Sequence, residues 1–532
     1  MGKKKQMRSE VKGNVKNSIG RIAFAALAVL LQIGWILILM IKLYQYSSVI
    51  SLLTSLFALV VALRIYGKHT NAAFKMPWII VILAFPVFGL CIYGLFGHKE
   101  AMHKIIRKFE DVDAQLIPLN VQDETILQQL EQEDPLLANQ CHYIWKYGNY
   151  PVYDTTAVKF YPEAYLGYEE QLKELEKAKH FIFLEYHAVE EAEAFARLKD
   201  VLARKAAEGV EVRILYDDVG CIGFLDKSFI DRMNAIGVQC RVFNYVVPFL
   251  NIFMNNRDHR KIMVIDGKVG FTGGYNLADE YFNITHPYGY WKDTGVKLTG
   301  RAVQNFTMMF LEMWNVMGQA DTCYEDPAYY EKYLKASQEG AEDGNVQKAS
   351  GYVQPYADSP LDGEPVGENV YLNLIKTAKK RLYVATPYLI ISDEMTRELG
   401  LAAKRGVDVR VFTPGIPDKK IIYGVTRSYY SGLVRQGVRV YEYTPGFLHA
   451  KQMLCDGDTA TVGTINMDYR SLYHHFENGV WMHGCDAIRD IEADFDKLLQ
   501  DSEEVTDKYR DGRKNMAVRG WQCIMRLIAP LL

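Results

Sequence analysis

Three long apolar runs lie within the first hundred residues of the chain. The run from Ile22 to Ile41 has no charged residue over about 20 positions, the length needed to cross the hydrocarbon core of a bilayer. Val49 to Leu63 is shorter but can be extended to residue 66, and Pro77 to Phe96 contains Pro86. The pattern predicts an N-terminal helical transmembrane region over residues 1–99, with spans near 22–41, 49–66 and 77–96.

Two questions about these runs stay open. A buried or interfacial helix is the alternative for the second run. Basic residues precede the first run and also follow the third, as Lys99, Lys104, Arg107 and Lys108. Because both flanks are basic, the charges do not decide which side of the membrane carries the rest of the chain.

From about residue 150 onward, short apolar strands alternate with amphipathic helices. In the first half we expect strands at His180–His187 and Val210–Tyr216, with a helix at Ala192–Glu208 between them. The second half repeats this order, with the corresponding strands and helix at Arg381–Pro387, Val407–Thr413 and Asp393–Arg405. This order predicts an α/β fold made of two tandem α/β sandwich repeats.

These patterns divide the chain into consecutive regions. After the membrane region we expect a linker over 100–149, a first repeat over 150–335, an inter-repeat linker over 336–368, a second repeat over 369–515 and an apolar tail over 516–532.

The two repeats share a spaced motif, His-x-Lys-x4-Asp followed by a Gly-x-x-Asn. The first copy consists of His259, Lys261, Asp266 and Asn276, and the second of His449, Lys451, Asp456 and Asn466. The histidine-to-asparagine spacing is 17 in both copies (276 − 259 and 466 − 449). Chance would give roughly 0.2 matches to the His-Lys-Asp part in a chain of this composition. Two copies with equal spacing therefore predict one pseudo-two-fold active site.

Histidine suits a two-step displacement because its pKa lies near neutrality, at about 6.5. One imidazole can attack and hold a covalent intermediate, while the other protonates the leaving group. The lysines and asparagines supply donors for the charge that develops on a phosphate ester, without a metal. The motif is symmetric, so it does not decide which histidine is the nucleophile.

The repeat extends to a second carboxylate in each half. Asp293 and Glu477 each stand at the start of a strand that follows the motif, and they are the best candidates to orient the histidines. Asp266 and Asp456 complete the motif and are grouped with the catalytic residues. They fall on the opposite strand face from the lysines, however, so a structural role is at least as consistent with the pattern.

Composition narrows the function classes. The formal net charge is −3, which disfavours nucleic acid as a partner. The 8 cysteines contain no Cys-x-x-Cys pair, which argues against a zinc site or a disulfide framework. We expect no cofactor and no metal.

The paired motifs resemble those of the phospholipase D superfamily, and within it the bacterial cardiolipin synthase family. The resemblance rests on NNRDHRKIMVIDGKVGFTGGYNLADEY and YWKDTGVKLTGRAV in the first half, and on FLHAKQMLCDGDTATVGTINMDYRSL and FENGV in the second. It implies a membrane enzyme that moves a phosphatidyl group from phosphatidylglycerol to a histidine, releases glycerol and transfers the group to a second phosphatidylglycerol to give cardiolipin. It also implies that His259 is the nucleophile and that His449 is the acid and base.

Two other functions are compatible with the motif. A hydrolytic enzyme of the same superfamily would differ only in using water as the acceptor. A non-catalytic membrane scaffold is disfavoured, because His, Lys and Asn are intact in both copies. We expect phosphatidylglycerol and membrane lipid as partners and a multi-pass location in the cell membrane; the sequence gives no oligomeric state.

Two further apolar stretches have open interpretations. Val246–Met254 lies just before the first motif and either dips into the bilayer or packs in the core. Trp521–Leu532 either lies on the membrane surface or packs as a helix on the domain.

Overall fold

The computed structural model describes residues 48–97, 102–245, 255–318, 326–339, 349–510 and 516–531, with six isolated positions between 27 and 38. The chain forms two compact units: one of residues 1–106, 244–256 and 514–532, the other of residues 107–243 and 257–513. Apart from the isolated positions, the predicted span 22–41 lies outside the described residues, as does the whole apolar loop 246–254.

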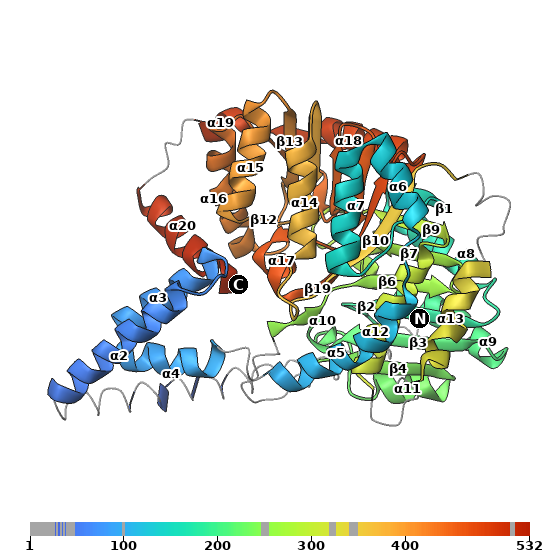
Figure 1. Cartoon of the computed structure of the whole chain (residues 1–532), viewed down its shortest axis with the longest axis horizontal. Helices are drawn as coiled ribbons and strands as arrows, with labels where there is room; N and C mark the ends of the chain where they lie inside the picture. The colour runs from blue at the N-terminus through green and yellow to red at the C-terminus, as the bar shows by residue number, and fades with distance from the viewer. Residues whose placement is uncertain are drawn as a thin grey trace, which may run out of the picture. The chain divides into compact units, whose positions relative to one another are not determined.

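The first unit is helical. Its helices are α2 (Ser48–Tyr66), α3 (Ala72–Ala84), α4 (Pro86–Phe96) and α20 (Met516–Ile528), with a short 3-10 turn η7 (Ala529–Leu531) (Figure 1). A small apolar cluster of Ala58, Ile65, Ile82 and Tyr93 joins α2, α3 and α4. The tail also contacts α3 through α20.

The predicted span 77–96 is not a single helix. Helix α3 ends before Phe85, and Pro86 begins α4. Proline has no N–H to continue the hydrogen-bond ladder of the preceding turn, so the chain starts a new helix there. Gly89 permits the tight return, because a Cβ at this position would lie 2.5 Å from the Cα of Ile82.

Among the described residues, we find no helix whose length and hydropathy together would let it cross a membrane. The predicted multi-pass region is therefore not confirmed.

The first half of the second unit is built on a seven-stranded sheet in the order β1-β9-β7-β6-β2-β3-β4. Its strands are β1 (Thr156–Tyr161), β2 (Phe181–Tyr186), β3 (Glu211–Asp217), β4 (Val238–Phe243), β6 (Lys261–Ile265), β7 (Val269–Gly273) and β9 (Gly295–Gly300). The helices of this half are α8 (Ala164–Leu175), α9 (Glu193–Ala207), α10 (Asp218–Cys221), α11 (Phe229–Ala235), α12 (Val303–Val316) and α13 (Pro327–Glu339). The predicted strands and helices of this half match β2, β3 and α9 closely.

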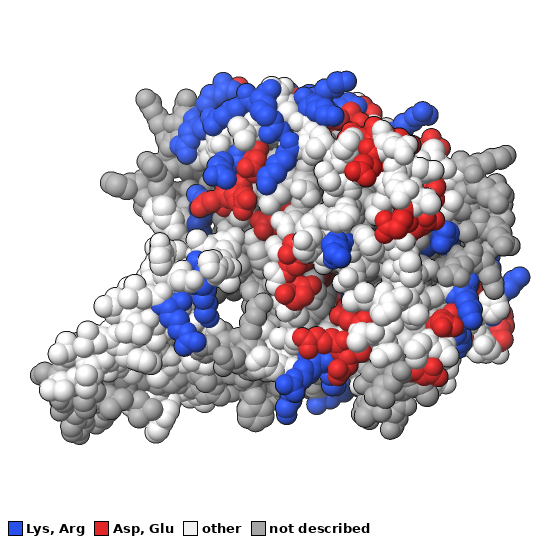
Figure 2. All heavy atoms as spheres, in the orientation of Figure 1, with Lys and Arg blue, Asp and Glu red and all other residues white. Residues whose placement is uncertain are grey.

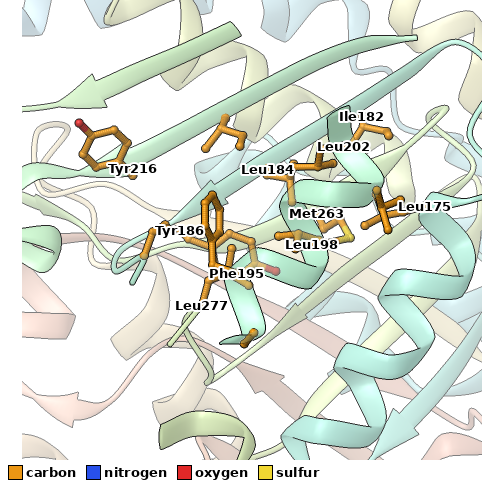
Figure 3. Close-up of a cluster of buried hydrophobic side chains, with 14 of the residues drawn as sticks. Leu175, Ile182, Leu184, Tyr186, Phe195, Leu198, Leu202, Tyr216, Met263 and Leu277 are labelled. Atoms are coloured by element: carbon orange, nitrogen blue, oxygen red, sulfur yellow. The ribbon is translucent and has the colours of Figure 1, made fainter. Parts of the chain in front are cut away.

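Strand β2 is buried along its whole length because helices cover both of its faces. Ile182, Leu184 and Tyr186 point into the apolar cluster that α8, α9 and α11 close (Figure 3). On the other face Phe183 stacks on Phe310 of α12, with ring centroids 4.5 Å apart. Alternate residues of a strand face opposite sides, so a continuous apolar run suits a central strand.

The second half repeats this sheet in the order β10-β19-β17-β16-β11-β13-β14, with β20 (Ser502–Glu504) added at the edge. Its strands are β10 (Tyr352–Asp358), β11 (Arg381–Ala385), β13 (Asp408–Pro414), β14 (Arg439–Tyr443), β16 (Gln452–Cys455), β17 (Thr459–Gly463) and β19 (His475–His483). Helices α14 (Val366–Thr377), α15 (Asp393–Lys404) and α16 (Lys420–Val434) lie side by side on it (Figure 1). The remaining helices are α17 (Tyr469–Tyr473), α18 (Ala487–Gln500) and α19 (Thr506–Arg510). Two tandem α/β repeats are therefore confirmed.

Two stretches expected to be linkers belong to the folded body. Within 336–368, residues 352–358 form β10, which pairs with β19. Within 100–149 the chain forms α5 (His103–Leu116), α6 (Glu124–Glu133) and α7 (Pro135–Gly148). Helix α7 packs on α14 and β10, and Gln354 donates to the carbonyl of Cys141 at 3.0 Å.

The two halves pack through a pair of equivalent helices. Helix α12 of the first half also contacts β10, and α18 of the second half also contacts β1. In α12, the buried Asn305 donates to the carbonyls of Pro151 at 3.1 Å and Pro355 at 2.8 Å. One side chain therefore satisfies backbone groups of both halves, which fixes how they meet.

Candidate active site

Short strands exchanged between the halves bring the two motifs together. Strand β5 (Arg257–Asp258) pairs in parallel with the start of β19, and β15 (Gly446–Leu448) pairs in parallel with β8 (Tyr290–Lys292). The backbone hydrogen bonds between the halves continue at the two motif histidines. The His259 N–H donates to the carbonyl of Phe476 at 2.9 Å, and the His449 N–H donates to that of Lys292 at 2.7 Å. Each histidine is therefore anchored on the half that does not contain it.

His259 is held by a carboxylate of the second half. Its Nδ1 lies 2.9 Å from Oε1 of Glu477 and 3.0 Å from Oε2. Thr464 and Ser471 donate their hydroxyls to the same carboxylate, the latter at 2.6 Å. An Nδ1 that donates to a carboxylate leaves Nε2 with its lone pair, the form that can attack phosphorus.

His449 has the reciprocal partner. Its Nδ1 lies 2.6 Å from Oδ2 of Asp293 in the first half. Lys451 Nζ is 2.9 Å from the same nitrogen, but an Nδ1 that donates to Asp293 has no lone pair left to accept from Lys451. Gly274 makes room for this carboxylate, since a Cβ there would lie 2.1 Å from Asp293 Oδ1.

Burial lowers the pKa of both histidines, which favours the neutral form of each imidazole. For His259 the pKa falls well below the ordinary value, first through desolvation and then through Lys261 and His187. Desolvation and Lys451 lower the pKa of His449 to about 4, while Asp293 acts in the opposite direction. The Asp293 carboxylate therefore stabilises the protonated form of His449, whereas desolvation and Lys451 destabilise it.

Each motif lysine lies beside its own histidine. Lys261 Nζ donates to the carbonyl of His259 at 2.7 Å, and Lys451 Nζ donates to that of His449. An ammonium has three protons, so each lysine keeps donors for a phosphate. Desolvation, opposed by Glu477, lowers the pKa of Lys261 to about 7, and desolvation, opposed by Asp293, lowers that of Lys451 to about 8.

The two asparagines are both buried but differ in their contacts. Asn276 Oδ1 accepts from the N–H of Ala188 at 3.1 Å, and its Nδ2 donates to the hydroxyl of Tyr281 at 2.8 Å. Asn466 is 5% exposed, and its Oδ1 has no hydrogen-bond partner among the described residues. The Asn466 side chain therefore keeps an acceptor, Oδ1, for a donor group of a ligand.

The motif aspartates lie at turns rather than beside the histidines. Asp266 has φ +51 and accepts the backbone N–H groups of Lys179, His180 and Phe181 at 2.7 to 2.9 Å. Asp456 has φ +54 and binds residues 379–381 in the same way. This geometry favours the structural role over the catalytic grouping, because each carboxylate is saturated by the turn that precedes β2 or β11.

The side chains that pack around His449 differ in kind from those around His259. Around His449 the rings are aromatic, with centroid distances of 5.2 Å to Trp291, 5.5 Å to Tyr281 and 5.7 Å to Phe447. Around His259 they are imidazoles, 4.9 Å to His187 and 5.3 Å to His475. A symmetric backbone therefore carries an asymmetric site.

The sequence analysis did not single out His187, His475, Tyr281 or Trp291. The repeat contained one usable signal: His475 stands two residues before Glu477, and Trp291 stands two residues before Asp293. Each of these aligned positions packs on the ring of a motif histidine. His187 and Tyr281 have no such signal, because they reach the site through the folding of separate loops.

Comparison with known proteins agrees with this architecture. The family model described as "Cardiolipin synthase, PLD-like domain" matches residues 172–314 and 371–499, together more than half of the chain, and "Phospholipase_D-nuclease N-terminal" matches 54–98. Among solved structures, phosphatidylserine synthase of Haemophilus influenzae aligns with a TM-score of 0.51 at 13% identity, covering 70% of this chain and 95% of that one. The fold is thus that of phospholipase D-like proteins.

The sequence relatives are more specific. A cardiolipin synthase of a Geobacillus species is 34% identical over 488 residues, covering 91% of this chain and 94% of that protein. An uncharacterized protein of Streptococcus mutans is 41% identical over 458 residues, covering 86% and 96%. The chain belongs to the cardiolipin synthase family, and the resemblance stated from its motifs is confirmed.

The turn role of the motif aspartates can be tested by substitution. Asp266→Ala and Asp456→Ala should each reduce the free energy of unfolding by about 1–3 kcal/mol, because three backbone N–H groups of the turn lose a charged acceptor. Thermal unfolding of the detergent-solubilised protein measures this loss, and turnover per folded molecule should change little. His259→Ala is the matched control, with turnover lost and unfolding temperature kept. Loss of turnover at unchanged stability in Asp266→Ala would instead make that residue catalytic.

The lysine pKa values predict how anion binding depends on pH. Each ammonium is charged below its pKa, so affinity for a phosphodiester should fall as pH rises through about 7 to 8. Inhibition by dimethyl phosphate, whose charge is constant across the neutral range, should weaken by about tenfold or more between pH 6 and pH 9. Lys261→Arg should flatten the profile, because guanidinium stays charged. A flat profile in the unmodified enzyme would show that the lysines do not bind the phosphate.

Proposed function

We propose that this chain makes cardiolipin and glycerol from two molecules of phosphatidylglycerol through a phosphohistidine intermediate. The observation that carries the proposal is the pair of buried histidines, each bound through Nδ1 to a carboxylate of the opposite half. Two oriented imidazoles with two adjacent lysines supply a nucleophile, a proton carrier and charge stabilisation at one phosphate. Family membership supports the lipid identity of the substrate.

In the first step His259 Nε2 attacks the phosphorus of phosphatidylglycerol. The bond from phosphorus to the headgroup glycerol breaks, and protonated His449 gives its proton to the leaving oxygen. His259 suits attack because its low pKa keeps Nε2 unprotonated. His449 suits the acid role because Asp293 at 2.6 Å stabilises its imidazolium, and a bound phosphate anion adds to that effect.

In the second step the hydroxyl of a second phosphatidylglycerol attacks the same phosphorus. Neutral His449 removes the hydroxyl proton, the phosphorus–nitrogen bond breaks and His259 is restored. The charge on the phosphoryl oxygens during both steps lies beside Lys261 and Lys451, with Nδ2 of Asn466 as a further donor. No metal or cofactor takes part in this scheme.

The helical unit supports membrane association. Helix α2 leaves large apolar side chains exposed, among them Leu52, Leu53, Phe57, Val60 and Leu63. Its visible face carries almost no charged side chains (Figure 2). Exposed apolar area of this extent is expected to contact lipid. We therefore propose that the enzyme works at the cell membrane on substrate drawn from the lipid layer.

Product analysis tests the proposed reaction. With phosphatidylglycerol labelled in its acyl chains, detergent-solubilised enzyme should yield labelled cardiolipin with equimolar free glycerol. Phosphatidic acid as the main product would favour the hydrolytic alternative. His449→Ala should still acquire acid-labile label on the protein, whereas His259→Ala should acquire none and lose turnover by at least about a thousandfold. Label on His259→Ala but not on His449→Ala would reverse the two roles.

A further inference from the structure

A second cluster of ligand-type atoms overlaps the nucleophile. His259, His475 and Glu477 each point a nitrogen or oxygen inward, and these atoms all lie within 4.8 Å of one another. The Glu477 Oε1 atom is 2.9 Å from His259 Nδ1 and 3.5 Å from His475 Nδ1. One carboxylate oxygen therefore faces both imidazoles.

His475 has no other evident task in the fold. It is 9% exposed; its Nδ1 faces Glu477 Oε1 at 3.5 Å, and its Nε2 has no hydrogen-bond partner among the described residues. A buried polar group without a partner is costly, so an imidazole left in this state implies a ligand. The ring is tilted against that of His259, with centroids 5.3 Å apart.

Two imidazoles and one carboxylate are a donor set that selects borderline metal ions such as Zn²⁺. Three protein ligands leave a fourth position open, as in catalytic zinc sites. Glu477 is already positioned by the hydroxyls of Thr464 and Ser471, an outer layer of contacts that favours metal affinity. His259 and His475 keep 8% and 9% of their surface exposed, through which an ion can enter.

We propose that His259, His475 and Glu477 bind a divalent ion of the zinc class and that the bound ion blocks the transferase. The ion acts as an inhibitor and not as a cofactor. If it binds Nδ1 of His259, the proton that Nδ1 donates to Glu477 moves to Nε2 and occupies the attacking lone pair; if it binds Nε2, it covers the attacking atom. Either mode removes the nucleophile. The inhibitory part of this inference rests on the proposed function, whereas the binding part does not.

The opposite side of the active site provides an internal comparison. There the residue equivalent to His475 is Trp291, which packs on His449 at 5.2 Å but offers no metal ligand. Among the described residues, only the His259 side brings together three such groups. The inference therefore predicts one ion per chain rather than two.

Binding can be measured without reference to activity. Full-length enzyme in detergent is titrated with Zn²⁺ against a chromophoric chelator, and with Co²⁺ while visible absorption is recorded. The expected result is one ion per chain and a Co²⁺ absorption band of low-symmetry coordination. His475→Asn should weaken Zn²⁺ binding at least about tenfold and remove the band, because one of three ligands is lost. Glu477→Gln is a second ligand variant, and thermal unfolding shows whether each variant is folded.

His286→Asn is the matched control, because His286 is exposed and lies in a loop away from these contacts. It should bind Zn²⁺ as the unmodified enzyme does. The inference is overturned if folded His475→Asn and Glu477→Gln both bind Zn²⁺ as tightly as the unmodified enzyme, or if the unmodified enzyme binds none.

Inhibition is then scored as the fraction of each variant's own zinc-free activity. Half-inhibition in the unmodified enzyme should occur at the zinc concentration that half-fills the site, and His475→Asn should need at least about tenfold more zinc. Full activity with the site filled would contradict the inhibitory claim. If the enzyme binds zinc but makes no cardiolipin, the proposed function fails and the metal site stands; if it makes cardiolipin but binds no zinc, only the metal site fails.

Discussion

The hydrogen bonds between each histidine and the carboxylate of the opposite half are the interactions on which the site depends. Glu477 fixes the ring of His259, and Asp293 fixes the ring of His449. Because each carboxylate comes from the opposite half, neither half contains a complete histidine–carboxylate pair. Backbone pairing of the short exchanged strands brings each histidine to that carboxylate.

A duplicated backbone with unequal lining explains how one fold can assign two roles. The two sheets have the same strand order, and the two helices α12 and α18 bridge the halves in the same way. The rings around the histidines differ, however, with Trp291 on one side and His475 on the other. Aromatic side chains surround His449, whereas imidazoles surround His259. The proposed separation of nucleophile from proton carrier follows from side chains, not from topology.

Much of the fold and most residues of the candidate site could be predicted from the sequence. The repeated His-x-Lys and Asn positions, the second carboxylates and the order of strands and helices all follow from periodicity and equal spacing. The crossing of the carboxylates could not be predicted, because alignment of the two repeats places Asp293 and Glu477 equivalently and does not tell which histidine each one reaches. Which histidine each carboxylate reaches depends on the pairing of β5 and β15 with strands of the opposite half. This pairing joins segments far apart in the sequence, and no local sequence pattern indicates it.

Other features depended on backbone conformation. The positive φ of Asp266 and Asp456 removes them from the strand face on which a regular alternation would put them, and this explains their turn role. Pro86 divides a run that hydropathy alone treats as continuous. Residues 352–358 read as a linker because Gly, Pro and acidic residues surround them, yet they pair along their whole length with β19.

The crossed pairing is tested most directly by comparing four variants for covalent phosphatidyl labelling and for turnover. The account predicts that Asp293→Asn shares the phenotype of His449→Ala, and that Glu477→Gln shares the phenotype of His259→Ala. This matching does not depend on which histidine is the nucleophile. If Asp293→Asn instead behaved like His259→Ala, and Glu477→Gln like His449→Ala, each carboxylate would serve its own half and the account would be wrong.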